Sequence, residues 1–174
     1  MATREQIGFA KRVYAAAKQA NQEIDPSFVT AQAILETGWG KKVIGTANLF
    51  GITKGSQWKG KIVMVKTHEY YNTPNFKPTP PDKLVSVCKV AGKHRWYYTM
   101  MRAFKDFDTI EDCLKEHLRL FQKSGYKDAW PYRKNPFEFA KRICDGVGCK
   151  YATDPSYLTT ITSLIKTVRR YCEK

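Results

Sequence analysis

Glu36 stands in the last turn of a predicted helix, within the stretch TAQAILETGWGKKVIGTANLFG at residues 30–51. Asp25 is placed to cap this helix, and Pro26 takes its first position, where the missing N–H costs nothing. The negative end of the helix dipole disfavours a carboxylate there and raises its pKa, and Trp39 would add to the rise by desolvation. A carboxyl group protonated near neutral pH can act as a general acid. The alternative is that Glu36 is a solvated helix-end residue.

A second candidate carboxylate is Glu69, near the end of IVMVKTHEYY, whose β-branched and aromatic residues predict a strand. Two carboxylates that face a groove are the equipment of glycoside hydrolysis. By spacing alone the pair is weak evidence, because two glutamates this far apart occur by chance in most proteins. Aromatic residues that could stack on sugar rings lie near both in the sequence: Trp39, Phe50, Trp58, Tyr70 and Tyr71.

The elements that would position these residues are helices on either side of a β-rich insertion. Apolar periodicity predicts helices over 4–20 and up to Glu36, and again from residue 108 onward, with Asp154 and Pro155 starting the last one. Between them, strands are predicted at 62–71, 84–92 and 94–104, with a proline-rich loop at 72–82. We therefore expect an α+β fold. It would be a single domain over residues 1–174, with a β-lobe at about 45–105 and a cleft between two lobes.

The formal net charge of +14 is the strongest compositional signal. From residue 37 to residue 105 the only acidic residues are Glu69 and Asp82, among many lysines and arginines. Such a field attracts a polyanion: nucleic acid, an anionic membrane face or an anionic cell wall. The alternative is a basic surface that serves solubility alone.

No cofactor or metal is expected. The three histidines stand apart in the sequence, and no pair of the five cysteines has the CxxC spacing of a zinc or redox site. Cys113 and Cys172 fall on apolar stripes and are predicted to be small core residues. Cys144 and Cys149 could reach each other across a turn, and the sequence leaves open whether they pair.

The sequence has no apolar run of transmembrane length, and the charged N-terminal segment lacks the apolar core of a secretory signal. If Met1 is the natural start, we expect synthesis in the cytosol. A monomer is the default expectation.

Six sequence motifs, AQAILETGWG, ANLFGI, WKG, THEYYN, RAFKDFDTIEDCL and YATDPSY, come in the order and approximate spacing of glycoside hydrolase family 73. The sequence resembles that family's lysozyme-like domain from about residue 24 to residue 166. The resemblance implies a lysozyme-like α+β fold and a metal-independent peptidoglycan hydrolase. It would cleave the β-1,4 bond between N-acetylglucosamine and N-acetylmuramic acid.

The resemblance also implies roles for individual residues. Glu36 matches the family's general acid, Glu69 its second glutamate, and Tyr151 the tyrosine thought to line the catalytic centre. Asn48 and Phe50 match residues that shape the floor of the groove, although this segment could also serve only to fix a turn.

Two further residues, Trp39 and Tyr70, are candidates for substrate binding. For Trp39 we favour the alternative, a buried side chain that supports the end of the Glu36 helix, and Tyr151 could be a packing residue.

The chain departs from the family in its proline-rich loop and an added basic segment, Lys77–Arg95. The departure leaves open how close Glu69 comes to Glu36, and with it the mechanism. Inversion through a water, a retaining nucleophile and attack by the substrate's own acetamido group all remain possible. We favour Glu36 as acid, with Glu69 as a less essential base or stabiliser.

The sequence is therefore interpreted as an endo-β-N-acetylglucosaminidase. We favour a phage-type endolysin over the alternative, a hydrolase of an export or secretion apparatus. It would wait in the host cytoplasm and then act on peptidoglycan glycan strands, with the basic β-lobe drawn to the anionic wall. The rivals are a muramidase that cuts the other glycosidic bond, a basic nucleic-acid-binding module, and a non-catalytic peptidoglycan-binding protein. No specific nucleic-acid partner is expected, since no RNA-recognition signature, zinc finger or basic zipper is present.

Overall fold

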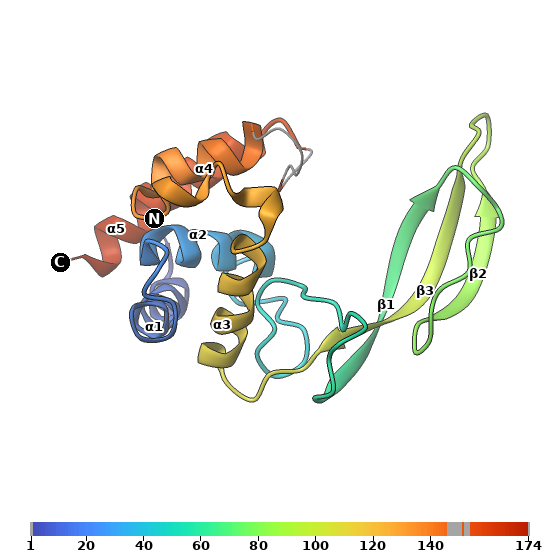
Figure 1. The fold of residues 1–174 in the computed structure, drawn as a ribbon, viewed down its shortest axis with the longest axis horizontal. Coiled ribbons are helices and arrows are strands. Elements are labelled where there is room, and N and C mark those ends of the chain that lie inside the picture. The colour runs from blue at the N-terminus through green and yellow to red at the C-terminus, as the bar shows by residue number, and fades with distance from the viewer. Residues whose placement is uncertain (1, 146–150, 152–153, 174) are drawn as a thin grey trace. The chain divides into compact units, whose positions relative to one another are not determined.

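The structure is a computed structural model that describes residues 2–145, 151 and 154–173. The chain divides into two compact units (Figure 1). A helical unit is made of Met1–Phe50 and Phe107–Lys174, and a sheet unit is made of Gly51–Asp106. The α+β class and the lysozyme-like fold are confirmed. That residues 1–174 act as one hydrolase domain stays a prediction.

The helical unit begins with two helices whose ends the sequence predicts. In α1 (Arg4–Ala20), Thr3 and Gln6 form a capping box, and in α2 (Pro26–Thr37) the Asp25 side chain accepts from the Ser27 N–H. Further along the chain come α3 (Ile110–Phe121), α4 (Pro136–Asp145) and α5 (Tyr157–Cys172). Two short 3₁₀ turns, Ser124–Tyr126 and Trp130–Tyr132, lie between α3 and α4.

The start of the last helix differs from the prediction. Asp154 and Pro155 were expected to cap and begin it, but α5 begins at Tyr157. The Asp154 carboxylate instead accepts from the N–H and the hydroxyl of Ser156, which makes a local turn in front of the helix.

Aromatic rings fill the core of the helical unit. Phe28 of α2, Phe121 of α3 and Phe139 of α4 are fully buried and meet edge to face, with ring centroids 4.9–5.9 Å apart. Edge-to-face packing is favourable for aromatic pairs beyond the area that they bury. These rings tie α2 to the segments that follow the sheet unit in the sequence.

The sheet unit is an antiparallel sheet of β1 (Ile62–Tyr71), β2 (Lys83–Lys89) and β3 (Trp96–Lys105) in the order β1-β3-β2. The predicted strands, the loop at 72–82 and a hairpin turn at Gly92 (φ +68°) are confirmed. The register of β2 shifts between Leu84 and Ser86, so Val85 lies at a β-bulge. No helix in the described part of the chain has the length and hydropathy that a membrane span requires.

Candidate active site

Glu36 lies in the last turn of α2, as predicted, and Gly38 ends the helix in a left-handed conformation. The side chain is exposed at the surface, yet the surrounding protein removes enough water to raise the pKa of its carboxyl group. The helix dipole acts in the same direction, because the C-terminal end of a helix is negative. A carboxyl group in this setting is suited to donate a proton.

Tyr151 is the partner of Glu36. Its hydroxyl donates a long hydrogen bond of 3.5 Å to Glu36 Oε1, which lowers the pKa of the carboxyl group and opposes the desolvation. The Tyr151 N–H donates to the Ile143 carbonyl at 3.0 Å, and its ring stacks on Phe121 with centroids 5.6 Å apart. Burial raises the pKa of Tyr151 itself well above its ordinary value, so it stays a hydrogen-bond donor at any physiological pH.

The turn after Glu36 has an unusual backbone. Gly38, Trp39 and Gly40 all have positive φ, at +56°, +64° and +83°. A positive φ is uncommon for a bulky residue such as Trp39 and is typical of functional segments. A Cβ on Gly40 would come within 2.5 Å of the Phe9 ring, so this position requires glycine for space as well as conformation. The turn fixes the half-buried Trp39 directly beyond the Glu36 helix end.

A buried polar network lies one helical turn before Glu36. The Gln32 side-chain oxygen accepts from His117 Nε2, and its amide nitrogen donates to the Tyr157 hydroxyl, both at 2.8 Å. Gln32 and His117 are completely buried, and Tyr157 is nearly so. The Tyr157 ring in turn contacts Tyr151, with centroids 5.5 Å apart. Through the Tyr157 ring, the network therefore supports Tyr151, the hydrogen-bond partner of Glu36.

Burial lowers the pKa of His117 to about 3, and its Nδ1 is buried without a hydrogen-bond partner among the described residues. In the unfolded chain the pKa is near 6.5, so between these values only the unfolded state takes up this proton. Unfolding free energy should therefore fall as pH drops through this window, by about 1.4 kcal/mol per pH unit from His117. Urea unfolding across this pH range checks it.

The variant His117→Leu should lose this part of the pH dependence, whatever its absolute stability. The exposed residue His94 provides the control, because His94→Gln should keep the wild-type slope. Equal slopes in wild type and His117→Leu would contradict a neutral buried imidazole.

Asn48 and Phe50 lie in the segment that follows the Trp39 turn. Asn48 is buried, and its backbone exchanges two hydrogen bonds with Ile44 at 3.1 and 3.2 Å. Phe50 stacks on the His117 ring, with centroids 3.8 Å apart and planes 20° from parallel. Both residues therefore have clear packing contacts, and their substrate-binding role stays a prediction.

Glu69 lies in β1, where it is opposite Tyr98 of β3. Its carboxylate accepts from Arg102 Nη1 at 2.9 Å, and Arg102 Nε lies 3.6 Å from the Asp82 carboxylate. Asp82 also accepts from the Ala103 N–H at 2.8 Å. One guanidinium thus holds two carboxylates, which fixes the orientation of Glu69 within the sheet unit.

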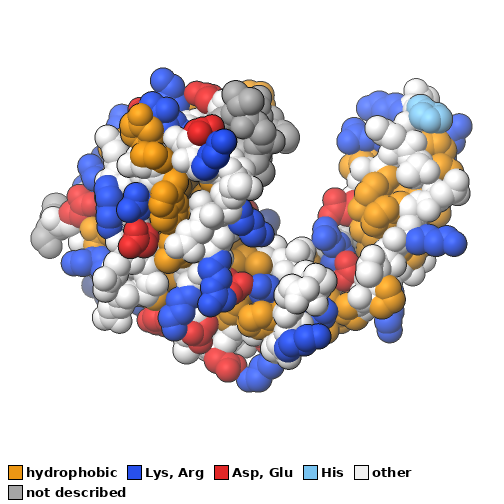
Figure 2. Space-filling view, in the orientation of Figure 1, with side chains coloured by type: hydrophobic (Ala, Val, Ile, Leu, Met, Phe, Trp, Pro, Cys, Tyr) orange, Lys and Arg blue, Asp and Glu red, His pale blue; other side chains and the backbone are white. Residues whose placement is uncertain are grey.

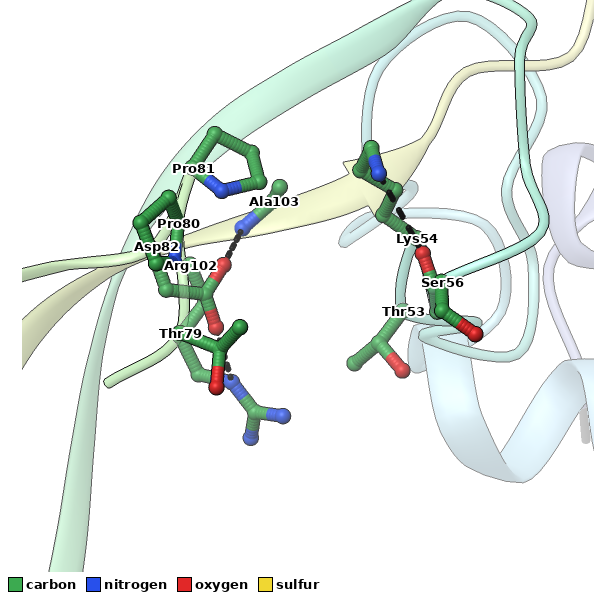
Figure 3. Close-up of a pocket in the computed structure, with 10 residues that line it drawn as sticks. Thr53, Lys54, Ser56, Thr79, Pro80, Pro81, Asp82, Arg102 and Ala103 are labelled. Carbon is green, nitrogen blue, oxygen red and sulfur yellow. Dashed lines mark hydrogen bonds and ion pairs between the residues drawn. The ribbon is translucent and has the colours of Figure 1, made fainter. Parts of the chain in front are cut away.

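A pocket of about 530 Å³ opens beside this ion-pair network in the sheet unit. In Figure 3, Thr79, Pro80, Pro81 and Asp82 form one side and Thr53, Lys54 and Ser56 the other. Arg102 reaches from the Glu69 pair into the lining of this pocket. The pocket has hydroxyl and backbone groups in its lining, and its size suits a polar group as large as a sugar.

Tyr70 follows Glu69 directly and lies on the opposite face of the sheet, because side chains alternate along a strand. Glu69 shares its face with Tyr71 and Tyr98, whose rings contact each other. Tyr70 instead contacts Tyr97, and the Arg95 guanidinium lies 4.8 Å from its ring centre. The two predicted residues therefore serve different surfaces of the sheet unit.

Of the predicted residues, the structure brings Glu36 and Tyr151 together, and Trp39 follows Glu36 three residues later in the chain. The sequence reasoning missed Gln32 and His117. Their signal was present: each is a polar residue on an otherwise apolar helical stripe, and Gln32 precedes Glu36 by one turn. Among the residues described, no group of His, Cys, Asp or Glu is arranged to hold a metal ion. Cys149 lies outside the described residues.

The chain is similar over most of its length to known proteins. A family model described as glucosaminidase, mannosyl-glycoprotein endo-beta-N-acetylglucosaminidase, matches residues 12–170. Peptidoglycan hydrolase FlgJ of Pseudomonas aeruginosa is 26% identical over 155 residues, which cover 85% of this chain and 32% of that protein. A "Probable N-acetylmuramidase" of Lactococcus lactis subsp. cremoris is 27% identical over 175 residues, covering 94% of this chain and 34% of that protein. The chain spans about a third of the length of these relatives.

Solved structures of hydrolases are also similar to this chain. A mutant peptidoglycan hydrolase from Sphingomonas sp. A1 superposes with a TM-score of 0.65 and 26% identity, covering 95% of this chain and 97% of that one. The truncated glycoside hydrolase domain of FlgJ from Salmonella typhimurium gives a TM-score of 0.70 at 21% identity, covering 95% and 98%, and bears on the fold alone.

Proposed function

The chain belongs to the glucosaminidase family, and we propose that it is a glycoside hydrolase that cleaves the glycan strands of peptidoglycan. The bond proposed is the β-1,4 linkage between N-acetylglucosamine and N-acetylmuramic acid. The proposal depends on Glu36 at the end of α2. The pKa of its carboxyl group is raised, and the Tyr151 hydroxyl donates a hydrogen bond to it. The names of the relatives support the substrate.

In the proposed reaction, Glu36 in its protonated form donates its proton to the glycosidic oxygen as the bond to the anomeric carbon breaks. The leaving sugar thereby departs as an alcohol, and Glu36 becomes a carboxylate that the Tyr151 hydroxyl stabilises. A water molecule completes the reaction by bonding to the anomeric carbon. Glu69 is proposed to act as the base that takes a proton from this water, or as a charge that stabilises the oxocarbenium-like transition state. The Arg102 bond supports this role, because it keeps the Glu69 carboxylate in one orientation.

Trp39, Asn48, Phe50 and Tyr70 are proposed to contribute to substrate binding. Trp39 is the strongest of them, since its positive-φ backbone fixes it beside the Glu36 helix end. The basic sheet unit would favour the anionic cell wall over neutral surfaces. The interpretation as a phage-type endolysin stays a prediction, and wall hydrolysis does not depend on it.

The test is digestion of purified peptidoglycan, with mass spectrometry of the reduced fragments. We expect new reducing-end N-acetylglucosamine. Reducing-end N-acetylmuramic acid would instead establish the second candidate, a muramidase, which the name of the Lactococcus relatives favours. No fragments from several wall types would contradict hydrolysis of peptidoglycan.

Replacing Tyr151 by phenylalanine should shift the pH dependence of the reaction. The bond from Tyr151 lowers the pKa of Glu36, so its loss should raise that pKa further. A general acid works while protonated, and activity falls as pH rises through its pKa. The alkaline limb of the kcat/KM profile should therefore move to higher pH in Tyr151→Phe.

A matched control is Tyr132→Phe, which removes the hydroxyl of an exposed tyrosine in the same unit and should keep the wild-type profile. An alkaline limb that stays in place, or moves to lower pH, in Tyr151→Phe would mean that Glu36 is not the group that titrates there.

A further inference from the structure

Strand β2 is exposed along its whole length, at the edge of the sheet. Leu84, Val85 and Val87 keep 44%, 55% and 38% of their surface open to solvent. An antiparallel sheet commonly buries the apolar residues of one face, whereas this strand presents apolar side chains without any cover among the described residues. Val85 lies at the bulge, where it has no partner residue in the ladder with β3.

The same edge is strongly basic. The sheet unit carries eleven lysines and arginines against three acidic residues, and residues 83–105 contain no acidic residue at all. Two of the three acidic residues, Glu69 and Asp82, both form ion pairs with Arg102. Lys83, Lys89 and Lys93 have no acidic partner in the part of the chain that the structure describes.

Aromatic rings hold some of these cations in position. The Arg95 guanidinium lies 4.8 Å from the Tyr70 ring centre, and the Lys89 ammonium 6.0 Å from that of Trp96. Such contacts fix a cation without neutralising it, so its charge remains available to a partner. Figure 2 shows hydrophobic and basic side chains interleaved over the surface of the sheet unit.

We propose that this apolar and basic edge, made of Leu84, Val85, Val87, Lys89 and Lys93, docks on the surface of an anionic phospholipid bilayer. Charge alone would fit any polyanion. A glycan or a nucleic acid, however, offers no apolar phase for three exposed aliphatic side chains. A lipid surface offers both, because anionic headgroups attract lysines while the acyl boundary takes up apolar side chains.

The test is sedimentation of the protein with vesicles of equimolar phosphatidylglycerol and phosphatidylcholine, compared with pure phosphatidylcholine. We expect binding to the anionic vesicles only, weakening as salt is added. Lys89→Gln with Lys93→Gln should weaken it about 25-fold, at about fivefold for each charge. Leu84→Ser with Val85→Ser should weaken it at least about tenfold, through the lost apolar contact.

Matched controls come from elsewhere in the chain. Lys11→Gln with Lys18→Gln makes the same charge change on exposed positions of α1, and Ile62→Ser makes the same polarity change on an exposed residue of β1. Both controls should bind vesicles as the wild type does. Circular dichroism checks that each variant is folded, which we expect because the changed side chains are exposed.

Two results would overturn the proposal. One is a wild-type protein that does not bind the anionic vesicles. The other is binding to anionic vesicles that the lysine variant weakens and the serine variant leaves unchanged. This result would indicate a binding site for polyanions in general, and binding of single-stranded DNA would then test it. The binding assay contains no peptidoglycan, so its failure is separate from that of the proposed hydrolase. Conversely, the serine variant should still cleave soluble glycan fragments.

Discussion

Glu36→Gln should lower kcat/KM for peptidoglycan by roughly 10²–10⁴-fold. Glutamine has nearly the same shape but no proton of suitable acidity, so the leaving sugar would have to depart as an alkoxide. The substitution occurs on an exposed side chain at the end of α2, and it removes no buried contact. The thermal unfolding midpoint and binding to insoluble peptidoglycan should therefore stay close to the wild type.

The control for this variant is Glu5→Gln, the same chemical change on an exposed residue in the first turn of α1. It should keep full activity. Glu36→Asp adds a finer test, because it retains the acid but moves it away from the glycosidic oxygen by one methylene. Activity of Glu36→Gln near the wild-type level would contradict general-acid catalysis by this residue.

The local structure around Glu36 could be predicted from the sequence because it depends on short-range rules. Asp25 and Pro26 start α2, and Gly38 ends it, so the helix places Glu36 in its last turn. The direction of the pKa shift follows from the same position and its surroundings. The hairpin at Gly92 was likewise predictable from strand composition and a glycine turn.

The support beneath the site could not be predicted in this way, because it depends on contacts between distant segments. Gln32 meets His117 and Tyr157, which lie 85 and 125 residues away in the sequence. Periodicity places His117 on an apolar stripe but does not show which side chain receives its hydrogen bond. The sequence therefore suggested an isolated histidine, whereas the structure places it at the centre of a buried network.

The faces of β1 give an intermediate case. Side chains alternate between the two faces along a strand, so the sequence alone already places Glu69 and Tyr70 on opposite faces of β1. Choosing Glu69 and Tyr70 together as site residues did not take this alternation into account. The Arg102 bond to Glu69 required the actual register of β1 and β3, which composition does not determine.

Phe121→Ala should destabilise the protein by about 3–5 kcal/mol, the usual cost of removing a buried phenylalanine ring. The Phe121 ring is fully buried and contacts Phe28, Phe139 and Tyr126, so several neighbours would have to move to fill the cavity. Urea unfolding measures the loss as a lower midpoint at an unchanged m-value.

The same ring stacks on Tyr151, so the cavity would also loosen the hydrogen-bond partner of Glu36. In Phe121→Ala, below its unfolding temperature, the alkaline limb of the kcat/KM profile should therefore shift upward, as in Tyr151→Phe. Phe137→Ala is the control, since this half-buried ring lies against Arg169 and should cost far less stability with no shift in the profile. A large loss of stability in Phe121→Ala with an unchanged pH profile would mean that the Phe121 ring does not position Tyr151. The backbone hydrogen bond from Tyr151 to Ile143 would then be the contact that orients it.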